Sequence, residues 1–346
     1  MNISQLRYRT TVILSAFTLK RFFNLVNNQI EYLQKKSILS SYPRSVSLEL
    51  NNYCNLKCES CPTHINTSKR AKRHITIDEL NIILEKLKGF NYNLSIGGNG
   101  EVTIVPKIEE YVELARKKNM FVFADTNFNC SKKVVYKLFK AGINMVNISL
   151  DGTTEKTYST YRKGGSFKTV FSNLLYLIDL KKKHKSIFPQ VRWQFIINKY
   201  NEHEVEKAKQ LAKQLKTVEL RLNLPFVPGG DNFVFSENKR IVNKISEKFL
   251  PLSEKFRIKG NIDLLTCYQP FSELQILCNG DIVPCCRLRE KNIIAGNIFK
   301  SELEDIWNNN IFQYFRKQLK NQGNSPDCLN CLKNMNKYLK NKNNPD

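Results

Sequence analysis

The sequence predicts an α/β fold in which six parallel strands form an open, partial barrel, followed by a small cysteine-rich module. Short apolar runs alternate with helical patterns from residue 45 to residue 224, and this order is typical of a parallel sheet with right-handed helical crossovers. Six such units are fewer than the eight that close a barrel. The alternation stops after Pro225, and six of the ten cysteines lie beyond residue 266.

Apolar patterning and the residues that start or stop helices place the individual elements. Thr76 and Glu79 form a capping box at the start of one helix, and Pro106 suits the first turn of the next. Ser131 can cap a third helix, which Gly142 ends. The expected strands are 46–50, 94–97, 121–124, 145–150, 192–197 and 219–224. The expected helices are 76–87, one opening at 106, 131–142, 167–180 and 205–215.

The residues before the first strand form an extension with a loose helical pattern. Such a stretch most often packs on its own barrel, and the alternatives are a membrane surface or a partner. The apolar residues of this pattern are Val12, Phe17, Phe22, Leu25 and Ile30. The expected units are an extension at 1–44, a partial barrel at 45–245, and a linker with the cysteine-rich module at 246–346.

Composition indicates a cytoplasmic globular protein. Hydrophobic residues make up 41% of the 346 residues, which is enough for a substantial core. No apolar stretch reaches the roughly 18 residues that a membrane span needs. The apolar run at 12–17 is too short for a signal peptide. In a reducing compartment, clustered cysteines bind metal more often than they form disulfides.

The net charge of +24 could serve nucleic acid, an acidic membrane surface or an anionic substrate. The basic residues are spread along the chain, and their densest runs are not interleaved with aromatic residues as a base-stacking platform would be. We therefore expect a solvated basic surface and no sequence-specific binding of nucleic acid.

Three cysteines lie within eight residues, directly after the first expected strand, as Cys54-x3-Cys58-x2-Cys61. Three thiolates on one loop can hold three irons of a cubane cluster and leave the fourth iron open to a ligand. Structural zinc is the alternative, but it usually requires a fourth ligand nearby, which His64 could supply.

Polar and glycine-rich motifs follow the second and fourth expected strands. Residues 97–101 read Gly-Gly-Asn-Gly-Glu, and residues 149–152 read Ser-Leu-Asp-Gly. Functional residues of parallel α/β folds gather at the carboxyl ends of strands, and glycines let the backbone approach a ligand closely. Arg162 could clamp a carboxylate through two hydrogen bonds. Asn201-x2-Glu204, after the fifth strand, is expected only as a helix cap.

The cysteine loop and these motifs resemble the radical S-adenosylmethionine (SAM) superfamily over residues 45–333. The resemblance implies that the open iron of a [4Fe–4S] cluster chelates SAM, and that reduction by flavodoxin or ferredoxin releases a 5′-deoxyadenosyl radical that takes hydrogen from substrate. The position before the third cysteine is often aromatic or bulky in this family and is Ser60 here. The implied cluster ligands are Cys54, Cys58 and Cys61, and the implied SAM-binding residues are Gly98, Gly100, Glu101, Ser149, Asp151 and Arg162.

The C-terminal module resembles the SPASM/twitch extension of the same superfamily. Gly280 and Asp281 suit a hairpin turn that presents Cys285. Because no cysteine follows Cys331, the shorter form with four cysteines and one auxiliary [4Fe–4S] cluster fits best, and zinc is the alternative. Cys278 and Cys286 are spare, and Cys130 is expected to be a buried core thiol. The expected auxiliary ligands are Cys267, Cys285, Cys328 and Cys331.

Three functions compete. The first is a two-electron oxidation of a small or carbohydrate-like hydroxyl compound. The second is the modification of a peptide or protein; enzymes that use leader peptides often carry an N-terminal domain larger than the 1–44 extension, which favours the first. The third is a non-catalytic iron–sulfur protein that binds nucleic acid, which would explain the charge but not the strand-end motifs. No residue stands out as the catalytic base, and an apolar barrel lining is common to many families.

Overall fold

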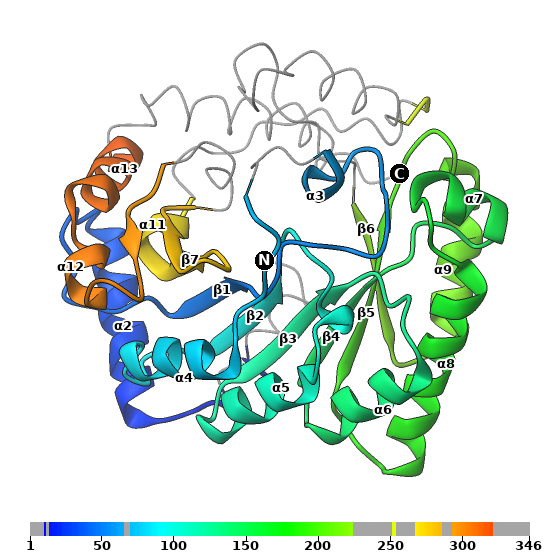
Figure 1. The fold of residues 1–346 in the computed structure, drawn as a ribbon, viewed down its shortest axis with the longest axis horizontal. Helices are drawn as coiled ribbons and strands as arrows, with labels where there is room; N and C mark the ends of the chain where they lie inside the picture. The colour runs from blue at the N-terminus through cyan, green and yellow to red at the C-terminus, as the bar shows by residue number, and fades with distance from the viewer. Residues whose placement is uncertain are drawn as a thin grey trace.

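The computed structural model describes residues 10–11, 14–65, 70–223, 251–253, 267–285 and 293–320. Within them, one nine-stranded sheet has the order β6-β5-β4-β3-β2-β1-β7-β8-β9 (Figure 1). Each neighbouring pair from β1 to β6 is parallel, which confirms the predicted partial barrel. The six parallel strands are β1 Ser45–Glu49, β2 Asn93–Gly97, β3 Phe121–Thr126, β4 Met145–Ser149, β5 Gln190–Ile196 and β6 Val218–Asn223.

Helices cover the outer face of this curved sheet (Figure 1). The predicted capping box is present: the Thr76 hydroxyl accepts from the Glu79 N–H, and the Glu79 carboxylate accepts from the Thr76 N–H. Ser131 occupies the predicted N-cap position but makes no side-chain capping bond. The crossover helices are α4 Ile77–Lys86, α5 Ile108–Lys117, α6 Lys132–Lys140, α8 Phe167–Lys183 and α9 Val205–Gln214. A short helix that the pattern did not predict, α7 Glu155–Tyr161, precedes α8.

The main core lies between the sheet and these helices, because alternate strand residues point to opposite faces. Leu48, Ile96, Ala124 and Ile148 are all fully buried on the helix-covered face. Burying a side chain such as Leu or Ile stabilises the fold by roughly 1.5–3 kcal/mol. The residues between them on each strand therefore face the inside of the barrel.

The C-terminal module continues the same sheet instead of forming a separate layer. Its strand β7 Glu273–Ile276 pairs in parallel with β1, and the hairpin partner β8 Asp281–Val283 is antiparallel to β7. Gly280 has φ +85°, so the predicted hairpin turn is confirmed. The remaining elements are β9 Gly296–Asn297, α11 Gln269–Ser272, α12 Leu303–Trp307 and α13 Asn310–Lys320. The expected boundary at residue 245 lies outside the described residues.

The N-terminal extension contains α2 Leu19–Leu33. Ala16, just before it, packs with Phe121 and Met145 at the amino ends of β3 and β4. The extension does contact its own barrel, as expected, but α2 turns four polar side chains inward and most of its apolar ones outward. Among the described residues, no helix has both the length and the apolar character needed to cross a membrane.

Candidate functional site

A cavity of about 130 Å³ lies at the carboxyl ends of the barrel strands. It brings together residues that are far apart in the sequence, because the carboxyl ends of parallel strands meet at one edge of the sheet. All three cysteines of the first loop and five of the six predicted SAM-binding residues line it. These are Cys54, Cys58, Cys61, Gly98, Gly100, Glu101, Ser149 and Arg162.

The cysteine loop is held by backbone hydrogen bonds to the rest of the site. The Lys57 N–H donates to the Lys163 carbonyl at 2.8 Å, and the Glu101 N–H donates to the Tyr53 carbonyl at 2.9 Å. The Cys54 sulfur accepts from the Leu56 N–H at 3.3 Å. These contacts tie the start of the loop to Glu101 and its middle to Lys163, which follows Arg162.

The chemistry of the thiol set suits an iron–sulfur cluster. Burial raises the pKa of the Cys54 thiol to about 11, so metal binding there displaces a proton. A cubane cluster gives each thiolate its own iron, whereas mononuclear zinc needs its ligands to converge.

The glycine-rich loop owes its position to a close approach to the end of β1. A Cβ atom at Gly100 would lie 2.3 Å from the Asn51 carbonyl oxygen. The Asn51 amide in turn donates to the Tyr53 carbonyl at 2.8 Å and to the Glu101 carbonyl at 3.2 Å. Only glycine fits at position 100, and the loop beside the cysteines depends on it.

Glu101 lines the cavity, yet most of its hydrogen-bonding capacity is used within the protein. Its Oε1 accepts from the backbone N–H of Thr103 at 3.0 Å and from the hydroxyls of Thr103 and Thr126. Its Oε2 accepts from the Asn127 N–H at 2.6 Å. Because a carboxylate oxygen has two acceptor sites, Oε2 can still take a donor such as the ammonium group of SAM. Through its bonds to Thr126 and Asn127, Glu101 also fixes the end of β3.

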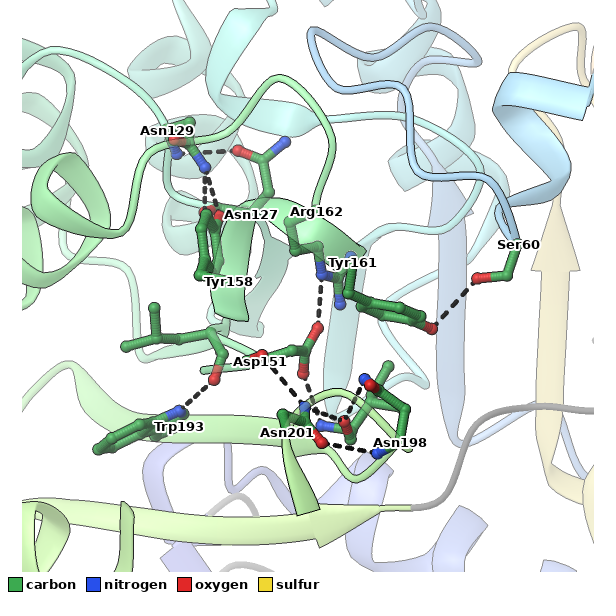
Figure 2. Close-up of polar contacts among 12 residues, drawn as sticks. Ser60, Asn127, Asn129, Asp151, Tyr158, Tyr161, Arg162, Trp193, Asn198 and Asn201 are labelled. Atoms are coloured by element: carbon green, nitrogen blue, oxygen red, sulfur yellow. Dashed lines mark hydrogen bonds and ion pairs between the residues drawn. The ribbon is translucent and has the colours of Figure 1, made fainter. Parts of the chain in front are cut away.

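Arg162 and Asp151 form an ion pair at the edge of the cavity (Figure 2). The Arg162 Nε donates to Asp151 Oδ2 at 2.5 Å, and the Ile196 N–H donates to Oδ1 at 2.5 Å. Burial opposes the charge on Arg162, but the Asp151 carboxylate outweighs it and raises the pKa of Arg162 above its usual value. Asp151 is fully buried and is not among the cavity-lining residues. The geometry gives Asp151 the role of positioning Arg162, and direct contact between Asp151 and SAM stays a prediction.

The motif at Asn201 and Glu204 supports this pair in a way that the sequence did not indicate. The Asn201 amide donates to the Asp151 carbonyl at 3.1 Å and to the Ile196 carbonyl at 2.8 Å (Figure 2). Glu204 accepts from the Thr153 N–H at 2.6 Å, so it braces the turn before α7. Asn201 and Glu204 occupy N-cap positions but make no side-chain capping bond, so the motif holds the Asp151 turn instead of capping its own helix as expected.

Sequence reasoning missed a row of polar side chains inside the barrel. The Asn147 amide donates to Asp125 Oδ1 at 2.7 Å, and Arg192 donates to Asn147 Oδ1 at 3.2 Å and to Glu219 Oε2 at 3.1 Å. The four residues are register partners across β3, β4, β5 and β6, and Asp125 lines the cavity. We call Asp125, Asn147, Arg192 and Glu219 the polar ladder. This part of the barrel interior is therefore polar.

Sequence reasoning also missed Asn127, which lies two residues beyond Asp125. Its amide donates to the Cys54 sulfur at 3.5 Å and to Asn55 Oδ1 at 2.9 Å. An N–H donor to a ligand sulfur is one of the means by which proteins tune cluster potentials. The available signal was the polar run at the end of a strand next to the glycine-rich loop.

The remaining cysteines are only partly placed. Cys267 and Cys285 are half-buried, while Cys286, Cys328 and Cys331 lie outside the described residues. Cys278 is buried against Arg70, whose guanidinium donates to its sulfur at 3.7 Å, and burial raises the pKa of this thiol to about 12. Cys130 is half-buried and packs against the core.

Comparison with known proteins finds two family models in this chain. A family model described as the radical SAM superfamily matches residues 48–192, and one described as an iron–sulfur cluster-binding domain (SPASM) matches residues 267–332. An AdoMet-dependent heme synthase of Methanosarcina barkeri is 24% identical over 81% of this chain and 85% of its own. A GTP 3′,8-cyclase of Alkaliphilus oremlandii is 22% identical over 72% of this chain and 83% of its own.

Solved structures share the fold. Streptococcus suis SuiB bound to S-adenosylmethionine superposes with a TM-score of 0.59 at 18% identity, covering 83% of this chain and 70% of SuiB. SuiB bound to its precursor peptide SuiA gives the same TM-score and identity, with coverage of 84% and 70%.

Proposed function

Because this chain belongs to the radical SAM superfamily and carries a C-terminal iron–sulfur cluster-binding domain, we propose that Cys54, Cys58 and Cys61 hold its catalytic [4Fe–4S] cluster. The family match means that the enzyme uses SAM and a [4Fe–4S] cluster, and its C-terminal domain implies an auxiliary iron–sulfur centre. The observation that carries the assignment is the shared cavity, in which the three thiols face the glycine-rich loop and Arg162.

The chain's own residues position the reactants. When bound, the cluster supplies the electron that cleaves SAM and so generates the radical that removes a hydrogen atom from substrate. Arg162, held by Asp151, offers its guanidinium to the SAM carboxylate. Glu101 Oε2 offers an acceptor to the SAM ammonium group. The Asn127 amide and the Leu56 N–H stabilise negative charge on the Cys54 sulfur.

We further propose that the substrate is a small, hydroxyl-rich compound that undergoes a two-electron oxidation. The polar ladder supports this, because it makes this part of the barrel interior polar and brings the Asp125 carboxylate to the cavity wall, where an apolar substrate would be unfavourable. Burial opposes ionisation of Glu219, but the charges of Arg192 and Arg221 outweigh it and lower its pKa. The polar ladder therefore carries charges of both signs.

Asp125 is the candidate proton acceptor for this reaction. Oxidation of a CH–OH group to a ketone removes one hydrogen atom from carbon, one proton from oxygen and one further electron. Asp125 is the ladder carboxylate that lines the cavity, so it can take the hydroxyl proton. The remaining electron requires an acceptor, and the auxiliary iron–sulfur centre is the group of that class implied by the C-terminal domain.

The oxidation is tested with aminocyclitols, polyols and sugar nucleotides carrying deuterium on their CH–OH carbons. We expect one of these classes to yield a ketone and deuterated 5′-deoxyadenosine in equal amounts, measured by mass spectrometry. Asp125→Asn should slow ketone formation by roughly 100-fold or more, because a positioned base contributes at least that much. Lys209→Ala, which removes an exposed lysine on α9, serves as the control and should change nothing.

Peptide modification is the second candidate, and the SuiB structure bound to precursor peptide SuiA favours it. If the substrate is a peptide, peptides should stimulate SAM cleavage, and none of the deuterated hydroxyl compounds should. That outcome would replace the hydroxyl oxidation but leave the cluster assignment in place.

A further inference from the structure

Helix α2 is inverted relative to an ordinary surface helix. Six of its large apolar side chains are between 40% and 68% exposed, whereas Leu25 and Tyr32 pack against the core. The spacing of three or four residues between the exposed side chains puts them on one stripe of the helix. We call this stripe the apolar face of α2, and it consists of Leu19, Phe22, Phe23, Val26, Ile30 and Leu33.

The opposite face of α2 is fixed to the barrel by buried polar contacts. The Arg21 guanidinium donates to the carbonyls of Gly89 at 3.2 Å, Lys118 at 2.9 Å and Asn119 at 2.6 Å. Rolling the helix to hide its apolar face would leave this buried charge and these carbonyls without partners, which is strongly unfavourable. The outward orientation of the apolar face is therefore built into the fold.

Further contacts along the same side make the anchoring continuous. The Asn24 amide donates to the Tyr42 carbonyl, and the Tyr42 N–H donates back to Asn24 Oδ1 at 2.8 Å. The Asn28 amide donates to the Phe271 carbonyl at 2.6 Å. Glu31 accepts from the backbone of Ser40 at 2.7 Å. Every turn of α2 is thus held by a polar side chain.

The apolar face continues beyond the helix itself. Leu14, Phe17 and Ile38 are each more than half exposed. An open groove of about 500 Å³ lies between α2 and the stacked rings of Tyr42 and Phe90. A contiguous apolar patch of this kind on a water-facing surface marks an interaction site.

Charge indicates what the apolar face meets. Lys20 near the start of α2 and Lys36 just after its end are exposed, and Lys35 is half-buried. The single acidic residue of residues 1–36, Glu31, is buried against Ser40 and Ser41. The whole chain carries a net charge of +24. A helix with an apolar stripe beside basic residues is the pattern of helices that lie in the plane of a membrane interface, attracted by anionic headgroups.

We propose that α2 docks the enzyme on the surface of an anionic lipid bilayer, with its apolar face at the boundary between headgroups and acyl chains. The orientation of the barrel follows from the contacts of Arg21. Gly89, Lys118 and Asn119 precede β2 and β3, so α2 lies toward the amino ends of the strands. The cavity at the carboxyl ends then opens away from the bilayer, toward water-soluble substrate and reductant.

The test uses full-length, reconstituted protein and sedimentation with vesicles. Parent protein should bind vesicles of phosphatidylcholine and phosphatidylglycerol in equal parts more tightly than vesicles of phosphatidylcholine alone, and added salt should weaken the binding. Phe23→Gln/Ile30→Gln should lower the affinity by at least about tenfold, since burying each of these side chains is worth about a decade or more. SAM cleavage by this variant should equal that of the parent and show that it is folded.

Leu175→Gln is the matched control. Leu175 is 43% exposed on α8, which lies on the other side of the barrel from α2 (Figure 1), and its replacement should leave vesicle binding unchanged. The proposal is overturned if parent protein stays in solution with both vesicle types. A parent dimer that Phe23→Gln/Ile30→Gln converts to monomer, without vesicle binding, would assign the apolar face to a second copy of this chain. If the parent protein is monomeric and does not bind vesicles, the apolar face of α2 is covered by another part of this chain.

Discussion

Replacing Cys54, Cys58 and Cys61 together by alanine should lower the iron content of anaerobically reconstituted protein from about eight to about four atoms per chain, one cubane cluster's worth. Each of the three thiols lines the same cavity, and the loop offers a cluster no substitute ligand of the same kind. The auxiliary centre, which depends on cysteines beyond residue 266, should keep its iron. Iron and zinc analysis of the purified variant measures this directly.

Cys130→Ala provides the control for this experiment. Cys130 is half-buried and packs against the core, and it belongs to neither predicted ligand set, so this variant should keep about eight irons. A triple variant that also keeps them would remove the loop cysteines from the cluster assignment. Zinc in place of the remaining iron would make the C-terminal centre a zinc site.

Gly100→Ala should reduce SAM cleavage by about 100-fold, because a displacement of about 1 Å near reacting groups has an effect of that size. The new methyl group would lie 2.3 Å from the Asn51 carbonyl oxygen and 2.4 Å from its Oδ1. The carbonyl belongs to backbone at the end of β1, so rotation of a side chain cannot relieve the clash. The glycine-rich loop must move away from the cysteine loop, and overpacking of this kind also lowers stability by about 1–3 kcal/mol.

Gly89→Ala separates this effect from a general sensitivity of glycines. A Cβ at Gly89 meets no atom within 4 Å, although its φ of +69° makes alanine mildly strained. This variant should lose some thermal stability and retain SAM cleavage. Equal activity losses in Gly89→Ala and Gly100→Ala would show that the close approach to Asn51 is not the cause.

Local patterns were sufficient to predict the barrel and the position of the cavity. The capping box at Thr76 and the alternation of strands with helices are encoded within a few residues of each element. The cysteine loop and the glycine-rich loop could be paired from the sequence because parallel strands bring their carboxyl ends together. The order of the strands along the chain was therefore enough to place these residues in one site.

Long-range partners could not be predicted in the same way. Asp151 and Arg162 both follow β4, and only the direction of their side chains shows that Asp151 stands behind Arg162. The polar ladder depends on the register between strands, as in the pairing of Asn147 with Arg192. The apolar pattern of α2 revealed two faces, but Arg21 binds carbonyls roughly a hundred residues away, so the face that packs inward was not predictable.

The central claim is that this chain cleaves SAM reductively at the cavity formed by the cysteine loop. The most direct test is to incubate the reconstituted parent protein with SAM and a low-potential reductant without oxygen, and to quantify 5′-deoxyadenosine and methionine by chromatography. We predict that both products form in equal amounts and that the Cys54→Ala/Cys58→Ala/Cys61→Ala protein forms neither. A parent protein that holds its full iron complement, yet yields no 5′-deoxyadenosine, would contradict the account.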